Sequence, residues 1–329
     1  MDQGPPRRWL SEAQRMDARI AELRPQADRR VVGQHVISRV LLRRFAAPIG
    51  SAGYQVLPFD LRHPARLHKV RGVGACGRMN NFAPFASASL EEVRGRLETQ
   101  VPEAAKAVDR GDVFQSEQYV RVLKDLIALH WVRSLHFRAV HQQIFNEVYT
   151  EHRTALLTHK SGLLRAAVLQ RYRLHLPGPA GLAAAADELL RPQVENFASG
   201  ADFRVRIEEA FGKAKEIIGS TGLEILVPEE GEFLLGDIPA LTVCQDGGIR
   251  TYGMALGDST GVVLPFGPRH LLVGRTPRNG FVAATAATVK DLNHLQIEAA
   301  RRHVYLRPHS ALDGFVRNYL DCGGRSSGD

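Results

Sequence analysis

Residues 116–149 have the sequence SEQYVRVLKDLIALHWVRSLHFRAVHQQIFNEVY. Apolar side chains recur along it every three or four positions, a spacing typical of an amphipathic α-helix. The stripe consists of Tyr119, Leu123, Leu126, Ile127, His130, Trp131, Ser134, Phe137, Val140 and Ile144. Ser116 is a suitable N-cap. We therefore expect one long helix from Ser116 to about Tyr149.

Strand patterns lie on both sides of a helical block that extends over about residues 89–218. Short apolar segments punctuated by Gly and Pro occur at 54–59, 67–73, 223–227, 232–235, 261–265 and 270–274. Each group has too few strands for a stable sheet of its own. The sequence thus predicts an α+β fold with a predominantly helical core and a small mixed or antiparallel sheet, built from both ends of the chain.

The remaining segments complete the expected organisation. Residues 34–45 and 281–302 are expected to be helices. Residues 1–30 are expected to form a basic helical arm, capped by Ser11, whose sparse apolar stripe makes it peripheral and dispensable for folding. We predict a single α+β domain over residues 31–306, followed by a C-terminal extension, 307–329, with a disordered Gly/Ser-rich tail.

Composition limits the classes of function. The 329 residues are 44% hydrophobic and 24% charged, which excludes disordered and collagen-like chains. We find no apolar run long enough for a membrane span and no signal peptide. Three widely spaced cysteines favour the reducing cytoplasm. A net charge of +8 favours an acidic partner, nucleic acid first, and another protein remains open as a partner.

The sequence contains neither a complete dinucleotide-binding motif nor a recognisable metal-binding motif. The segment Gly72-Val-Gly-Ala-Cys-Gly77 matches G-x-G-x-x-G, but the loop sequence after it gives no βαβ unit. We therefore expect a glycine turn between strands and no nicotinamide or flavin. The thirteen histidines lack the spacing of a metal motif, although a divalent metal held by distant residues remains open.

Several polar residues are candidates for a site. His35, with Gln34, is placed at the start of the expected helix 34–45, where an anion would be favoured and a proton could be exchanged. Arg133 and Arg138 lie on the long helix with His130 and His141, and buried cations there must meet carboxylates or a bound anion. Asp237 ends an apolar strand, a position common for catalytic carboxylates and equally common for an Asp turn.

Six of these pieces, in order, resemble a bacterial domain-of-unknown-function family, number 4238. Gln34-His35-x6-Leu42-x2-Phe45 is similar to its QHxxPxxxLxxF signature, with Ser38 in place of the proline. The other similar pieces are Leu97-Glu98, Arg133 with Arg138, Gly236-Asp237-Ile238-Pro239, 263–268 and the closing segment from Asn293 to Tyr305. The resemblance covers about residues 31–306. It implies a shared fold and a set of shared polar residues, but it does not indicate which reaction, if any, they catalyse.

The candidate residues come from separate segments, as active-site residues do. One hypothesis is a phosphodiester hydrolase, a nuclease used in defence or as a toxin. His35 would be the general acid/base, Asp237 and Glu98 would orient it or hold a metal, Arg133 and Arg138 would bind phosphate. Gln34, Asn293 and Arg301 would support them. The alternative is a non-enzymatic module that binds nucleic acid or protein, with a structural polar core; a buried, fully paired network would favour it.

Overall fold

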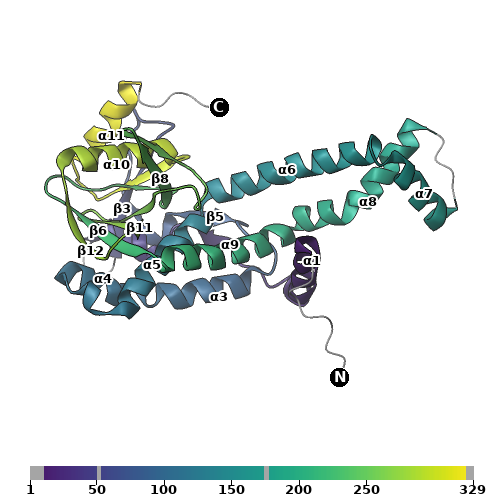
Figure 1. Cartoon of the computed structure of the whole chain (residues 1–329). Helices are drawn as coiled ribbons and strands as arrows, with labels where there is room; N and C mark the ends of the chain where they lie inside the picture. The colour runs from purple at the N-terminus through teal and green to yellow at the C-terminus, as the bar shows by residue number, and fades with distance from the viewer. Residues whose placement is uncertain (1–10, 50–52, 174–177, 324–329) are drawn as a thin grey trace. The chain divides into compact units, whose positions relative to one another are not determined.

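The computed structural model describes residues 11–49, 53–173 and 178–323 (Figure 1). Contacts divide the chain into two compact units. Unit 1 contains Met1–Arg30, Ala83–Ser87 and Arg138–Arg206, and unit 2 contains Val31–Phe82, Ala88–Phe137 and Ile207–Asp329. Helices predominate and strands form several sheets, so the expected α+β class is confirmed. The domain boundaries expected from the sequence stay predictions, and the tail expected to be disordered lies largely outside the described residues.

The larger sheet of unit 2 is built from the C-terminal half of the chain alone. Its order is β12 (Gly280–Ala284), β6 (Gly222–Pro228), β11 (His270–Thr276), β10 (Gly261–Gly267), β8 (Leu241–Asp246) and β9 (Ile249–Tyr252). β12 runs parallel to β6 and the other pairs are antiparallel. The sequence patterns missed β8, β9 and β12, so the argument that this half had too few strands for its own sheet was wrong.

The second sheet joins the two ends of the chain, as expected. Its order is β2 (Ala47–Ile49), β3 (Gly53–Asp60), β13 (His303–Leu306) and β7 (Leu235–Gly236), with β4 (Arg71–Gly72) also paired to β3. β13 lies antiparallel to β3, with Tyr305 opposite Pro58. A third, two-stranded sheet pairs β1 (Gly33–His35) with β5 (Arg78–Asn80). The second and third sheets position the site described below.

Helix α10 (Ala286–Ala299) contributes to the hydrophobic cores beside both large sheets. Val289, Leu292 and Leu295 pack with Val263 and Leu271 of the six-stranded sheet. Ile297 packs with Phe59 and Val304 of the second sheet, together with Val316 of α11 (Leu312–Asp321). Other helices that lie wholly or mostly in unit 2 include α2 (Arg39–Arg44), α3 (Ser87–Glu98), α4 (Val101–Arg110) and α5 (Glu117–Val132), with 3-10 helices η3 (Val73–Ala75) and η4 (Val113–Gln115).

The expected helix over 116–149 is two helices. α5 ends at Val132, and α6 (Leu135–Leu157) begins after a break at Arg133 and Ser134. The Ser134 hydroxyl accepts a hydrogen bond from the Phe137 amide at 3.0 Å and donates one to the Trp131 carbonyl at 3.0 Å. The Ser134 side chain thus bonds a free carbonyl at the end of α5 and a free amide at the start of α6. These bonds compete with continuation of the helix, and the spacing of apolar residues gives no sign of this competition.

Two other expected helices begin later than predicted. In residues 34–45, Gln34 and His35 are on strand β1, and helix α2 starts only at Arg39. His35 is therefore not at a helix N-terminus, because its backbone pairs with Arg78 of β5. In residues 281–302, the first residues form β12, and Thr285 caps α10 through the Thr288 amide at 3.2 Å.

In unit 1, the N-terminal helix α1 (Glu12–Leu23) is packed into a core rather than peripheral. Ser11 and Gln14 form a capping box, as the sequence suggested for Ser11. Met16, Ile20 and Leu23 are buried in a cluster with Phe85, Ala86, Ala201 and Val205. Other elements are η2 (Arg24–Gln26), α7 (Ser161–Tyr172), α8 (Pro179–Ser199) and α9 (Ala201–Gly219), and α6 and α9 have residues in both units.

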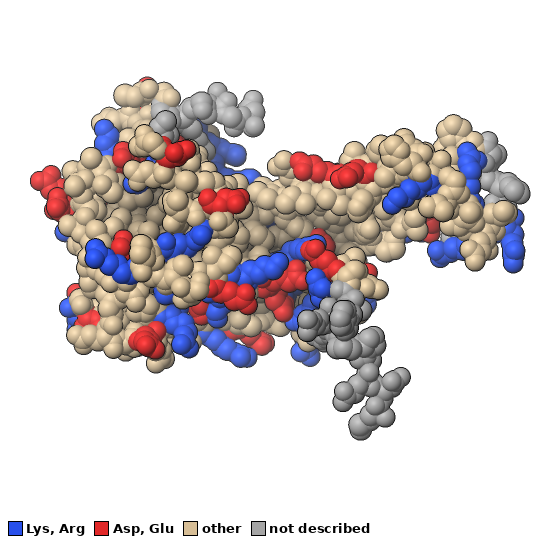
Figure 2. All heavy atoms as spheres, viewed as in Figure 1, with Lys and Arg blue, Asp and Glu red and all other residues tan. Residues whose placement is uncertain are grey.

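Within the described part of the chain, no helix combines the length and the apolar character that crossing a membrane requires. Figure 2 shows Lys and Arg side chains interspersed with Asp and Glu on the face in view. The excess of positive charge therefore does not form a uniform basic surface on that face.

Candidate functional site: a basic pocket in unit 2

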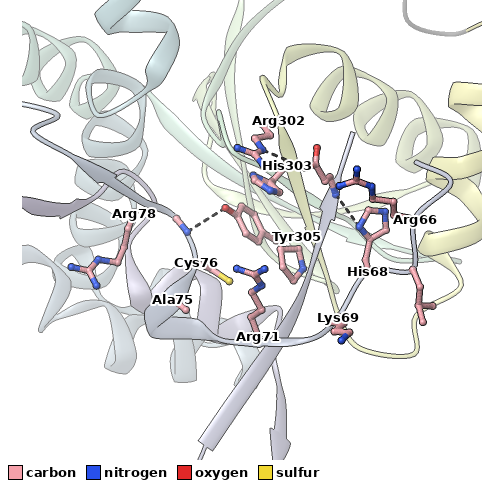
Figure 3. A pocket seen from close by; sticks show the side chains of 14 residues that line it. Arg66, His68, Lys69, Arg71, Ala75, Cys76, Arg78, Arg302, His303 and Tyr305 are labelled. Carbon is pink, nitrogen blue, oxygen red and sulfur yellow. Dashed lines mark hydrogen bonds and ion pairs between the residues drawn. The ribbon is translucent and has the colours of Figure 1, made fainter. Parts of the chain in front are cut away.

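A cavity of about 520 Å³ opens in unit 2 between the second sheet and the segment that follows β3 (Figure 3). This volume falls within the range of about 300–1,000 Å³ that is usual for small-ligand pockets. Its cationic lining residues are Arg66, Lys69, Arg71, Arg78 and Arg302, and its single carboxylate is Asp60. His68, His303, Tyr305 and Cys76 also line it. With neutral imidazoles the lining carries four more positive than negative charges.

Most of these cations have no counter-charge. Among the described residues, the side chains of Arg66, Lys69, Arg71 and Arg78 make no hydrogen bond or ion pair, and all four are exposed. Only Arg302 has an acidic partner, Asp60, at 3.3 Å. Four unpaired cations around one concavity repel one another, so the site is prepared for an anion that would relieve this repulsion.

The inner end of the pocket is formed by Tyr305, Cys76 and Gly77. The Gly77 amide donates a hydrogen bond to the Tyr305 hydroxyl at 3.2 Å, and Tyr305 is only 4% exposed. The O–H hydrogen of Tyr305 has no acceptor among the described residues, so it can be donated to a ligand. Burial raises the pKa of Tyr305, which keeps this proton in place at neutral pH.

The glycine turn predicted at residues 72–77 forms one wall of the pocket, and its conformation needs glycine. Gly77 has φ +63°, and a side chain there would meet Ile37 and Leu42 at 3.0 Å. The Gly77 carbonyl accepts hydrogen bonds from the amides of Val36 and Ile37 at 2.8 and 3.3 Å. The Gln34-His35 segment therefore helps to hold this wall of the pocket in place, because the next two residues, Val36 and Ile37, bond the Gly77 carbonyl.

The imidazoles of the pocket are neutral near pH 7. Burial lowers the pKa of His303, and the nearby Asp60 and Asp237 only partly oppose this. Burial, with the positive charge of Arg317, likewise lowers the pKa of His68. The Nε2 atom of His68 is buried without a hydrogen-bond partner in the described part of the chain. Burial also raises the pKa of Cys76, so its thiol is protonated and poorly nucleophilic.

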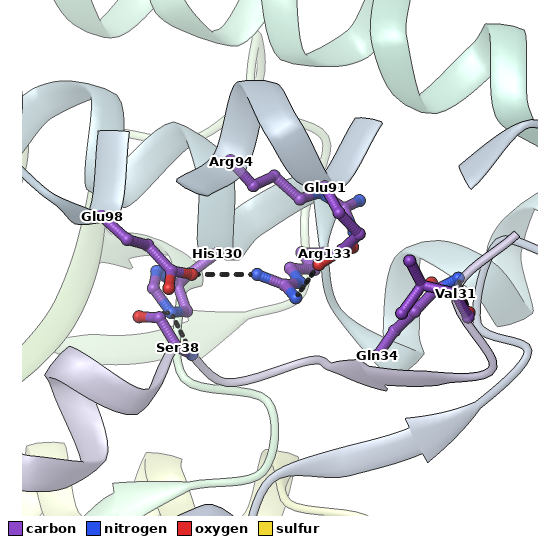
Figure 4. Close-up of polar contacts among 8 residues, drawn as sticks. All are labelled: Val31, Gln34, Ser38, Glu91, Arg94, Glu98, His130 and Arg133. Carbon is purple, nitrogen blue, oxygen red and sulfur yellow. Dashed lines mark hydrogen bonds and ion pairs between the residues drawn. The ribbon is translucent and has the colours of Figure 1, made fainter. Parts of the chain in front are cut away.

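Arg133 and Glu98 meet, as parts of a buried ion-pair network (Figure 4). Arg133 is 2% exposed and donates to Glu98 at 3.1 Å and to Glu91 at 3.2 Å. Arg94 adds a second contact to Glu91 at 2.6 Å. Burial raises the pKa of Glu98, although Arg133 favours its charged form. The cation expected to bind phosphate is thus already neutralised by two carboxylates.

His35 and Gln34 lie beside this network. Burial and the charge of Arg133 lower the pKa of His35. Its Nε2 atom is buried and, within the described residues, has no hydrogen-bond partner. The side-chain amide of Gln34 donates to the Val31 carbonyl at 2.9 Å, and Gln34 is fully buried. The described contacts place no acidic residue against the imidazole of His35.

His130, fully buried, forms a closed pair with Ser38. The hydroxyl of Ser38 lies 3.0 Å from the Nε2 atom of His130, and the Nδ1 atom is 3.0 Å from the Leu126 carbonyl. Burial lowers the pKa of His130 to about 3, so the ring stays neutral. Because both residues are 0% exposed, this serine–histidine pair is a structural bridge between the start of α2 and α5.

Asp237 accepts a hydrogen bond from the backbone of Arg301, whereas Asn293 bonds the segment that precedes Asp237. The carboxylate of Asp237 accepts hydrogen bonds from the amides of Arg301, Arg302 and His303 at 2.7–2.9 Å. Asn293 bonds the Leu234 amide at 3.0 Å and the Glu232 carbonyl at 2.9 Å. Among the described residues, no contact joins Asp237 to His35. Asp237 instead holds the backbone that leads into β13 and the pocket.

Arg138 belongs to unit 1, whereas Arg133 belongs to unit 2. Burial lowers the pKa of Arg138, and this residue also has interactions within the structure. In the same unit His141 lies 3.2 Å from Asp202, so the cationic face of the expected long helix does meet a carboxylate. The described residues contain no group of three His, Cys, Asp or Glu side chains placed to hold a metal.

Sequence reasoning missed the pocket cations, although a signal was present. Residues 62–78, RHPARLHKVRGVGACGR, contain five Lys or Arg residues and two histidines and lack any acidic residue. Their apolar and glycine pattern predicts only strands and a turn. A basic run that coincides with a glycine turn is a recognisable anion-binding pattern, because both flexible backbone and cations suit phosphate.

A family model with the description "Protein of unknown function (DUF4238)" matches residues 33–310. The chain belongs to this family. The match confirms the resemblance drawn from the six sequence pieces and covers nearly the whole of unit 2. It also includes all of the residues that line the basic pocket. Neither the curated proteins nor the solved structures contain a match to the chain.

Proposed function

We propose that the protein binds nucleic acid and that the basic pocket is where a phosphate group is held. The observation that supports this most directly is the set of four cations, Arg66, Lys69, Arg71 and Arg78, without partners in the described residues. Arginine donates in a planar fork that matches phosphate oxygens. The pairing of Arg133, Glu98 and Asp237 with other protein groups favours this binding role over their direct participation in catalysis.

Binding is tested with fluorescently labelled single-stranded RNA and DNA, by anisotropy over a range of salt concentrations. Arg71→Ala should weaken binding about tenfold and reduce the slope of log affinity against log salt by about one, because one phosphate contact is lost. Arg121→Ala is the matched control, since Arg121 is an exposed arginine of α5 outside the pocket. Equal losses in both variants would contradict a role for the pocket.

Hydrolysis of the bound phosphodiester is the second candidate function, favoured by one observation. The neutral imidazole of His303 lines the cavity between Arg71 and Arg302, where it could accept a proton. Purified protein incubated with labelled RNA and DNA, with and without divalent metal, tests this. Cleavage that disappears in His303→Gln but persists in the control variant supports it, and intact substrate in all reactions refutes it. We place either activity in the cytoplasm, in accord with the three free cysteines.

A further inference from the structure

We infer that the pocket recognises a terminal phosphate monoester rather than a phosphodiester within a strand. This inference rests on the proposed function, because it specifies which phosphate of the nucleic acid enters the pocket. Three features of the site carry it: the charge of the lining, the buried hydrogen-bond donors at the inner end and the apolar residues of the lining.

The charge of the lining exceeds what one phosphodiester needs. Five cations face one carboxylate, so four positive charges are uncompensated. A phosphodiester carries one negative charge, whereas a phosphate monoester carries about −1.5 to −2 at pH 7 and has three terminal oxygens. In Figure 3 the Arg71 guanidinium lies beside Cys76 and Tyr305, where its planar fork can donate to two oxygens of one phosphate group.

The inner end of the pocket provides hydrogen-bond donors. Tyr305, Cys76 and Gly77, which line it there, are buried. The O–H of Tyr305 is a donor without an acceptor in the described residues, and its residue is 4% exposed. The Nε2 atom of His68 is a second buried atom without a partner there. These groups can form hydrogen bonds with the oxygens of a phosphate group that enters the pocket.

The size and the lining agree with one terminal nucleotide. A cavity of about 520 Å³ is within the range usual for a small ligand. Leu67 and Pro58 add apolar surface to the lining, and Leu67 is 87% exposed. A sugar or base adjoining the phosphate would cover part of this surface. The end of a strand and a free nucleotide share this chemistry, so the test separates them.

The test compares one fluorescent single-stranded octanucleotide in three forms: with a 5′-phosphate, with a 3′-phosphate and with hydroxyl groups at both ends. We expect a terminal phosphate to tighten binding to the wild-type protein at least about tenfold. This preference should shrink to about twofold or less in Arg71→Gln and Tyr305→Phe and remain in Arg121→Ala. Thermal unfolding shows whether each variant is folded. If Tyr305→Phe does not fold, Arg71→Gln alone tests the inference.

The outcomes separate this inference from the proposed function. Equal affinity for phosphorylated and hydroxyl-ended strands, with binding still weakened by Arg71→Gln, overturns the inference and leaves nucleic-acid binding intact. Affinity that no pocket variant changes overturns both. Adenosine monophosphate and inorganic phosphate are then added as competitors. If adenosine monophosphate displaces the octanucleotide at an equal concentration, the ligand is a phosphate monoester and belongs to a free nucleotide. If neither competitor displaces the octanucleotide at a thousandfold excess, and the preference for a phosphorylated strand remains, the ligand is the phosphorylated end of a strand.

Discussion

Replacing Arg133 with methionine should destabilise unit 2 without removing a ligand contact. The substitution keeps most of the side-chain volume and removes the charge. Glu98 and Glu91, whose side chains are 22% and 23% exposed, lose the guanidinium that donates to them at 3.1 and 3.2 Å. Breaking a buried ion pair from one side costs about 3–5 kcal/mol. Because the two carboxylates retain some contact with water, we expect the lower end, about 3 kcal/mol.

The loss should depend on pH in a defined direction. Burial already raises the pKa of Glu98 in the folded protein, and removal of Arg133 raises it further. A carboxyl whose folded pKa exceeds its unfolded value of about 4.3 favours the folded state at low pH and opposes it as pH rises through the folded pKa. The deficit of the Arg133→Met variant should therefore be largest at pH 7 and shrink towards pH 4.5.

Urea unfolding followed by circular dichroism, at pH 7 and at pH 5, measures this deficit. A second variant, Arg133→Met with Glu98→Gln, removes one of the stranded carboxylates and should regain part of the loss at pH 7. A deficit below about 1 kcal/mol at pH 7 would refute the reasoning, because that is the value of a solvent-exposed ion pair. Phosphate-dependent binding by the folded variant should match the wild type, since Arg133 does not line the pocket.

Three further results are expected. Asp237→Ala leaves the amides of Arg301, Arg302 and His303 without their acceptor, and should lower the free energy of unfolding by about 3 kcal/mol or more in urea titrations; a loss under 1 kcal/mol would contradict the structural role. Because burial lowers the pKa of His303 and of His68, both rings gain charge only as pH falls below their usual range, so oligonucleotide affinity should rise from pH 7 to pH 5 and rise less in His303→Gln. Deletion of residues 1–30 exposes the cluster that contains Phe85 and Val205, and should reduce the thermal stability of unit 1, in contrast to the sequence-based expectation of a dispensable arm; an unchanged thermal transition would restore that expectation.

Local sequence patterns determined the elements whose signals are local. The N-cap at Ser11 follows from residue type and position and is present. The pairing of β3 with β13 was also expected, but the strand count from which it was argued was wrong. The division between α5 and α6 did not follow, because Ser134 competes for backbone groups against an uninterrupted apolar stripe. The placement of Gln34 and His35 on β1 also escaped prediction, since it depends on pairing with β5, which is more than forty residues away in sequence.

In the site, too, some features follow from the sequence and others depend on the tertiary structure. Sequence alone identified the family, the glycine turn and the excess of positive charge, because these depend on residue identity and order. Only the tertiary structure decided which cations are free: Arg133 meets Glu98 across 35 positions of sequence, whereas Arg71 and Arg78 meet no carboxylate in the described residues. Whether a charge is neutralised depends on groups within a few ångströms, and folding brings those groups together from segments that have no local relation in sequence.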